Sequence, residues 1–153
     1  MRTPVLQEAI HRCQLFGTFP DDVLGAVGSQ LASRSPSELF RMNPLSFAHQ
    51  ASLAPETCVD LFVCGTRAGL FDLSFDVICP TCGGMLFSSP ELGKVQSRMF
   101  CELCMLERVV TLDELIEASF TISPSIAPVA GNRYQDYPTF RHFHFSHNFR
   151  PSP

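Results

Sequence analysis

The chain has 153 residues, of which 45% are hydrophobic and 17% charged, a composition typical of a folded protein with one domain or two small ones. Its formal net charge is −4 and Lys94 is its single lysine, so the sequence lacks the basic field that general nucleic-acid binding requires. No apolar run is long enough to span a membrane, and Glu8 and His11 occupy a region that would be apolar in a signal peptide. We therefore expect a cytoplasmic protein without a membrane segment.

Residues 1–69 predict a bundle of short helices. Most of the predicted helices open at a proline or an acidic first turn and then repeat apolar residues at helical spacing. The segment Ser35-Pro36-Ser37-Glu38 also has the pattern of a capping box, in which Glu38 reaches back to the N-cap residue Ser35. The helices are expected to begin at Val5, after Pro20, at Pro36, at Pro44 and at Pro55, the last ending near Gly69.

After Gly69 the spacing of the apolar residues changes from helical to alternating, which predicts a half-buried strand leading to Cys79. Short helices followed by a strand also describe a winged helix, in which residues 55–68 would be the recognition helix. That helix offers Glu56 and Asp60 against Arg67, whereas a helix in the major groove presents basic or amide side chains. A winged-helix and zinc-ribbon transcriptional regulator that binds DNA is therefore kept as the alternative interpretation.

Two C-x-x-C turns follow the strand, with eighteen residues between them: Cys79 and Cys82 form the first, and Cys101 and Cys104 the second. Each turn can aim two sulfurs at one point, and a short intervening hairpin would complete a tetrahedral shell of four sulfurs. Zn²⁺ suits this shell best, and a rubredoxin-like iron site is the alternative. Because four thiolates leave no open position for water or substrate, the predicted zinc is structural and the predicted protein is not an enzyme.

A redox-active dithiol is a further alternative for the cysteine pairs. A thioredoxin-like protein would carry one C-x-x-C turn within a βαβ pattern, whereas this chain has two such turns and no such pattern. The three remaining cysteines, Cys13, Cys58 and Cys64, are expected to be buried apolar thiols, because no export signal favours disulfides.

The fold class is therefore predicted to be α+β: an N-terminal bundle of short helices, winged-helix-like, followed by a four-cysteine zinc ribbon of short antiparallel strands. The ribbon and the strand before it are assigned to residues 70–126, and residues 127–153 to a linker and tail. In the tail, His142 and His144 alternate with Phe143 and Phe145, so on a strand two imidazoles would share one face and could make a second metal site, with His147 nearby in sequence. Since no cysteine or carboxylate lies near them in sequence, a solvent-exposed strand or tail is the favoured interpretation.

The run Thr-Arg-Ala-Gly-Leu-Phe-Asp-Leu-Ser-Phe-Asp-Val-Ile-Cys-Pro-Thr-Cys at residues 66–82 resembles the uncharacterised N-terminal domain of bacterial adenylate/guanylate cyclases. The likeness begins near residue 36 and continues through Cys101-Glu102-Leu103-Cys104 and Ser123-Pro124-Ser125-Ile126. The resemblance implies a regulatory or scaffolding module in cyclic-nucleotide signalling, with a protein partner or a covalently linked cyclase domain. We expect no cyclase activity in the chain itself, because roughly two dozen residues after Val129 are too few for a catalytic domain.

Overall fold

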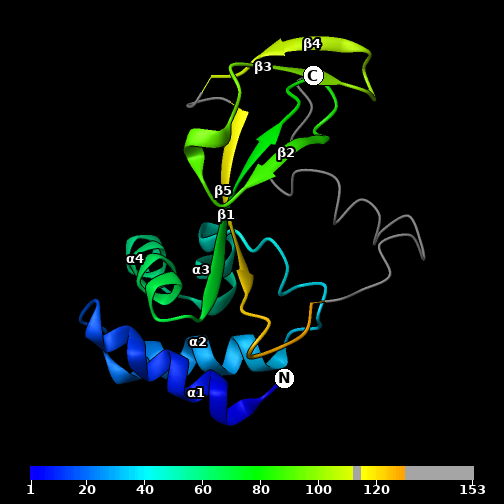
Figure 1. Cartoon of the computed structure of the whole chain (residues 1–153). Helices are drawn as coiled ribbons and strands as arrows, with labels where there is room; N and C mark the ends of the chain where they lie inside the picture. Colours follow the sequence, from blue (N-terminus) through cyan, green and yellow to red (C-terminus); the bar gives the residue numbers. More distant parts are fainter. Residues whose placement is uncertain (112–114, 130–153) are drawn as a thin grey trace. The chain divides into compact units, whose positions relative to one another are not determined.

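A computed structural model describes residues 1–111 and 115–129. Within these residues the chain forms four α-helices and five β-strands, which is the predicted α+β class (Figure 1). The chain divides into two compact units: the described residues of the first are 1–73 and 120–129, and those of the second are 74–111 and 115–119. The division falls within strand β1 (Phe71–Ile78) and within strand β5 (Ile116–Ile122).

The first unit contains the four α-helices, which form two neighbouring pairs (Figure 1). Prolines stand in the first turns of three of them, where a missing N–H costs no hydrogen bond. The Asn43 side chain caps α3 by accepting hydrogen bonds from the N–H groups of Leu45 and Ser46 at 2.9 and 3.0 Å. The helices are α1 (Thr3–Arg12, followed by the 3-10 turn η1 at Cys13–Leu15), α2 (Asp21–Ser33), α3 (Pro44–Ala51) and α4 (Pro55–Arg67).

Four phenylalanine rings form the centre of this unit's core. Phe62 on α4 stacks on Phe71 with ring centroids 4.4 Å apart and meets Phe47 and Phe120 edge to face at 5.1 and 5.3 Å. Phe120 comes from β5, and the buried Ile122 and Ile126 follow it into the same core. The core of the helical unit is therefore completed by a segment that the sequence analysis assigned to the ribbon and the tail.

The helix expected to begin at Pro36 does not form, and residues 36–39 make turns instead. The predicted local contacts are present, because Glu38 accepts hydrogen bonds from both the N–H and the hydroxyl of Ser35 at 2.9 and 2.6 Å. The backbone beyond is paired elsewhere: Met42 bridges Phe120, and the carbonyl of Leu39 accepts from the N–H of Ile122 at 3.0 Å. Pairing with β5 thus replaces the helical hydrogen bonds.

The second unit is built from short antiparallel strands, as predicted for the ribbon. Strand β2 (Met85–Ser89) pairs with β1 in the three-stranded order β2-β1-β5, and β3 (Arg98–Cys101) pairs with β4 (Leu106–Val109) as a separate hairpin (Figure 1). A 3-10 turn, η2 (Leu92–Lys94), lies between β2 and β3. The hairpin register places Cys101, the last residue of β3, opposite Leu106, the first residue of β4.

A buried carboxylate ties the strands of the second unit together. Asp76 on β1 is fully buried and accepts hydrogen bonds from the hydroxyls of Ser88 on β2, at 2.6 Å, and of Ser119 on β5. Ser74 lies 2.9 Å from the Ser119 hydroxyl oxygen and extends the network. Two hydroxyl donors compensate the cost of burying the charge and fix the positions of the three strands.

Candidate metal centre

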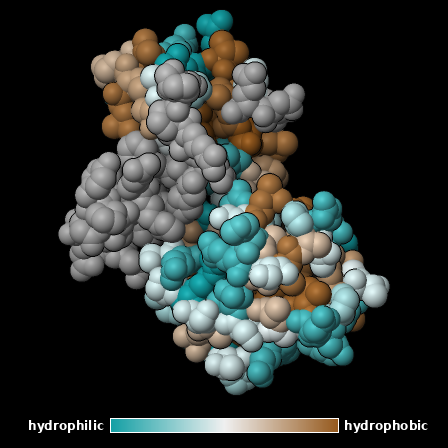
Figure 2. Space-filling view, turned by 180° about the vertical axis from the view of Figure 1, so that it is seen from behind, coloured by the Kyte–Doolittle hydropathy of each residue, from teal (hydrophilic) through white to brown (hydrophobic). Residues whose placement is uncertain are grey.

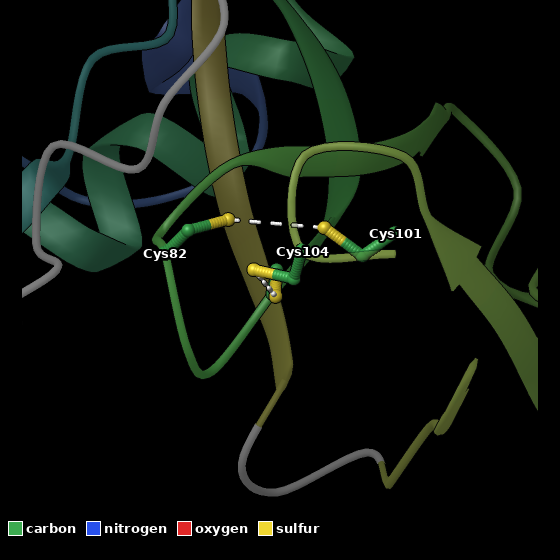
Figure 3. Close-up of side chains that lie close together, drawn as sticks. Cys82, Cys101 and Cys104 are labelled. Carbon is green, nitrogen blue, oxygen red and sulfur yellow. Dashed lines mark hydrogen bonds between the residues drawn. The ribbon is translucent and has the colours of Figure 1, made fainter. Parts of the chain in front are cut away.

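The structure brings together the four cysteines that the sequence singles out. The sulfur atoms of Cys79, Cys82, Cys101 and Cys104 all lie within 4.8 Å of one another. Two of the separations join different C-x-x-C turns: 3.9 Å between Cys79 and Cys104, and 3.8 Å between Cys82 and Cys101. Figure 3 shows the labelled sulfurs turned toward a common centre.

These separations fit a tetrahedral metal ion. Four sulfurs bonded to Zn²⁺ at about 2.3 Å must lie about 3.8 Å from one another, which is close to the two cross-turn distances. A disulfide would need a sulfur–sulfur distance of about 2.05 Å, so the arrangement is a set of four separate thiol groups. The cluster can therefore hold a metal ion, and the same four-sulfur geometry suits zinc and iron.

The first turn is a tight loop held by its own backbone. The N–H of Cys79 donates to the carbonyl of Gly84, and the N–H of Gly83 donates to the carbonyl of Cys79, both at 2.8 Å. Gly83 has a φ of 74°, a left-handed conformation that glycine adopts without a steric cost. The N–H of Gly84 also points at the sulfur of Cys82, at 3.4 Å. This loop brings two sulfurs to the cluster and holds one of them with a backbone hydrogen bond.

The second turn joins β3 to β4. Cys101 is buried at the end of β3, and Cys104 lies half-buried three residues later. Met105 then takes a left-handed φ of 54° before β4 begins. The pairing of β3 with β4 therefore fixes the positions of the Cys101 and Cys104 sulfurs.

The four thiols differ in acidity. Burial raises the pKa of Cys79, but hydrogen bonds from the backbone N–H groups of Cys82 and Thr81 and from neighbouring thiols outweigh burial and lower it to about 6. Burial raises the pKa of Cys82, and the hydrogen bond with Cys82 raises that of Cys104 to about 12. Because a ligating cysteine must be a thiolate, metal binding releases the protons that the other thiols retain.

Arg108 on β4 links the second turn to the first. Its guanidinium donates a hydrogen bond to the hydroxyl of Thr81, which lies between Cys79 and Cys82 in sequence. A fixed cation beside the cluster offsets part of the negative charge that four thiolates carry. The sequence did not predict a role for Arg108, because the contact depends on the hairpin register and no local pattern indicates it.

The other cysteines take no part in the cluster. Cys13 and Cys58 are fully buried in the first unit, as the sequence predicts for apolar thiols. Cys64 is half-buried, and its thiol donates to the carbonyl of Phe16 at 3.4 Å. The second site considered at His142 and His144 lies outside the described residues, as does His147.

The surface of α4 bears on the alternative DNA-binding interpretation. Glu56 and Asp60 are exposed on this helix, and the guanidinium of Arg67 lies over the ring of Phe16, 4.7 Å from its centroid. The cation of the expected recognition helix is therefore engaged within its own unit. Separately, among the described residues no helix has the length and apolar character needed to cross a membrane.

Comparison with known proteins gives one match. The sequence profile of a protein family, described as a family of unknown function (DUF5939), matches residues 16–148. No curated protein and no solved structure gives a significant match to the chain.

Proposed function

Because the chain belongs to the family of unknown function DUF5939, we propose its function from the geometry of its four-cysteine cluster. Cys79, Cys82, Cys101 and Cys104 hold a structural Zn²⁺ within a non-catalytic regulatory or scaffolding module. The observation that carries this proposal is the convergence of all four sulfurs within 4.8 Å, with two cross-turn separations of 3.8 and 3.9 Å that are close to those of a tetrahedral zinc shell.

The closed shell supports a structural role for the metal. When four protein sulfurs occupy the four positions around the ion, water and substrate have no place at the metal. The cross-turn separations also count against a working dithiol, because Cys79 and Cys82 each lie within 4 Å of a cysteine of the other turn. When bound, the metal supplies cross-linking between the two turns and no reaction.

The energetic case rests on the small size of the second unit. Structural zinc contributes about 10–16 kcal/mol of apparent binding free energy, comparable with the whole stability of a small domain. The ribbon has short strands and few buried apolar residues, such as Val77, Ile78 and Leu115. Its folding therefore depends on a contribution of this kind. Metal removal is therefore expected to unfold the ribbon.

Elemental analysis of the purified protein tests the metal assignment. We expect about one zinc per chain and no stoichiometric iron. Cys104→Ser should lose the metal, whereas Cys64→Ser, which alters a thiol of the first unit, should retain it. A wild-type protein that binds no metal, or a Cys104→Ser variant with full zinc content, would contradict the proposal.

The proposed setting is cyclic-nucleotide signalling, with a cyclase domain, separate or covalently linked, as the partner. Its support is the resemblance of residues 66–82 to the N-terminal domain of adenylate/guanylate cyclases. Incubation of the zinc-loaded chain with ATP or GTP should yield no cyclic nucleotide. Formation of cAMP or cGMP by the chain would refute the non-catalytic role, and the same assay with a cyclase domain present should reveal a change in that domain's rate.

A further inference from the structure

The β3–β4 hairpin exposes an unusual amount of apolar surface. Five of its large apolar side chains have 46–70% of their surface exposed, although the hairpin also supplies two metal ligands. Figure 2 shows hydrophobic surface gathered on the part of the molecule that contains this hairpin. They are Phe100, Leu103, Met105, Leu106 and Val109. By register Phe100 and Val109 share one face of the hairpin, whereas Leu106 lies on the other face and Leu103 and Met105 in the turn. Exposed apolar side chains that share a face indicate an interaction surface.

The strand register assigns the side chains to faces. Residues directly opposite each other on antiparallel strands point to the same side, and Arg98 pairs with Val109 while Phe100 pairs with Glu107. All four of these residues are exposed. One whole face of the hairpin is therefore open to solvent, and we call it the hairpin face.

The hairpin face is complementary to itself. Arg98 and Glu107 occupy one diagonal, with their charged atoms 3.8 Å apart, and Phe100 and Val109 occupy the other. A two-fold axis along the apolar diagonal would place Phe100 on Phe100 and Val109 on Val109 of a second copy. The same rotation places Arg98 opposite the second copy's Glu107 and Glu107 opposite the second copy's Arg98.

We propose that the hairpin face is a dimerisation surface on which a second copy of this chain docks. The two copies bury the apolar diagonals against each other, and the opposite charges at the rim fix the relative orientation. A lipid surface fits the face less well, because Arg98 is matched by Glu107 and no excess of positive charge meets anionic headgroups. A standard interface buries about 800 Å² per partner, so a face of four residues should give a weak, reversible dimer.

Sedimentation equilibrium of the full zinc-loaded chain tests the proposal. The wild type should dimerise reversibly, and Val109→Lys should weaken the dimer by roughly tenfold or more, since it buries a lysine in the centre of the contact. Leu15→Lys is the matched control, because Leu15 is 75% exposed but lies in the first unit, and it should dimerise as the wild type does. A wild type that remains monomeric up to about 1 mM overturns the proposal.

A charge exchange provides a second, independent readout. Arg98→Glu and Glu107→Arg each put like charges opposite one another, so each variant alone should dimerise less than the wild type. A mixture of the two restores both attractive pairs and should form a heterodimer, which native mass spectrometry resolves. This test leaves the apolar side chains unchanged, and zinc content confirms that each variant is folded.

The charge exchange also separates a second copy from other occupants. The alternative occupants of the hairpin face are a zwitterionic vesicle, another protein and residues 130–153 of the same chain. With any of these bound, the two charge variants would not pair selectively with each other. Equal behaviour of the mixture and the separate variants, or undiminished dimerisation of Val109→Lys with its zinc retained, overturns the proposal.

Discussion

Gly83 and Met105 occupy equivalent positions in the two C-x-x-C turns. Each follows the first cysteine of its turn by four residues, and each has a left-handed backbone, with φ of 74° and 54°. This conformation costs a residue with a side chain about 1–2 kcal/mol, whereas it costs glycine little. The first turn therefore satisfies the geometric requirement without strain, and the second carries the strain at Met105.

Gly83→Ala should weaken zinc binding. The added Cβ makes the left-handed conformation costly by about 1 kcal/mol, which corresponds to roughly a fivefold loss of affinity in competition with a chromophoric chelator. Met105→Gly is the reciprocal variant and should not weaken binding, because it removes the same cost from the second turn. Equal losses in the two variants would show that the left-handed positions do not limit metal binding.

Arg108→Gln should lower zinc affinity without abolishing binding. The glutamine loses the positive charge beside the thiolates and reaches Thr81 less well, and loss of outer partners of this kind costs about 10–100-fold in metal affinity for the better-studied ligands. Chelator competition measures the change. Arg98→Gln, on the exposed side of the hairpin, is the control, and an equal loss there would assign the effect to general charge.

Asp76→Asn should destabilise the second unit. In the wild type, two hydroxyls donate to the carboxylate, whereas the amide of the variant turns its NH2 group toward one of them. Losing a buried hydrogen bond to a charged group costs about 1–3 kcal/mol. Urea unfolding at constant zinc measures the loss. Asp72→Asn changes an exposed aspartate of the same strand and should leave stability within about 0.5 kcal/mol of the wild type.

The stability contributed by the buried thiols Cys13 and Cys58 should fall as the pH rises from 9 toward 11. Burial, with a further contribution from Cys64, raises the pKa of Cys13 to about 11, and burial raises that of Cys58 to about 11, against an unfolded value of 9.0. Between these values the unfolded thiols ionise first, so the folded state loses up to about 2–3 kcal/mol per thiol. Below pH 9 this contribution is fully present.

Urea unfolding across this pH range measures the effect, and the variant Cys13→Ala/Cys58→Ala isolates it. The variant should start less stable, because it loses two buried sulfurs, and the difference in stability between the wild type and the variant should shrink as the pH rises from 9 toward 11. Metal-bound thiolates contribute a slope of the opposite sign near pH 9, because the same thiols still bind protons in the unfolded state. That contribution is the same in the wild type and the variant, so the difference between their pH profiles isolates Cys13 and Cys58. Parallel pH profiles for the wild type and the variant would contradict the assignment.

Features with a short-range cause were predictable from the sequence. The two C-x-x-C turns, the alternating strand before Cys79 and the proline-opened helices α3 and α4 each follow from residues a few positions apart. These rules gave the class of the fold and the residues of the candidate site. They also predicted the hydrogen bonds between Ser35 and Glu38.

Features that depend on distant pairing were not predictable. The same Ser35 and Glu38 contacts form without a helix, because the backbone near Met42 pairs with Phe120. Arg108 meets Thr81 only through the β3–β4 register, and Phe120 enters the helical core from a strand that was assigned to the ribbon. In each case a long-range contact outweighs a local preference.

Because the division between the units falls inside β1 and β5, the second unit is an insertion within the sequence of the helical first unit. Leu73 and Phe120 are the two ends of one long loop, and both lie in the helical unit. Closing such a loop costs less conformational entropy when its interior is already folded. A ribbon folded around zinc therefore shortens the effective loop that the helical unit must close. Binding of a metal ion at the four cysteines should thereby favour folding of the helices through the connectivity of the chain alone.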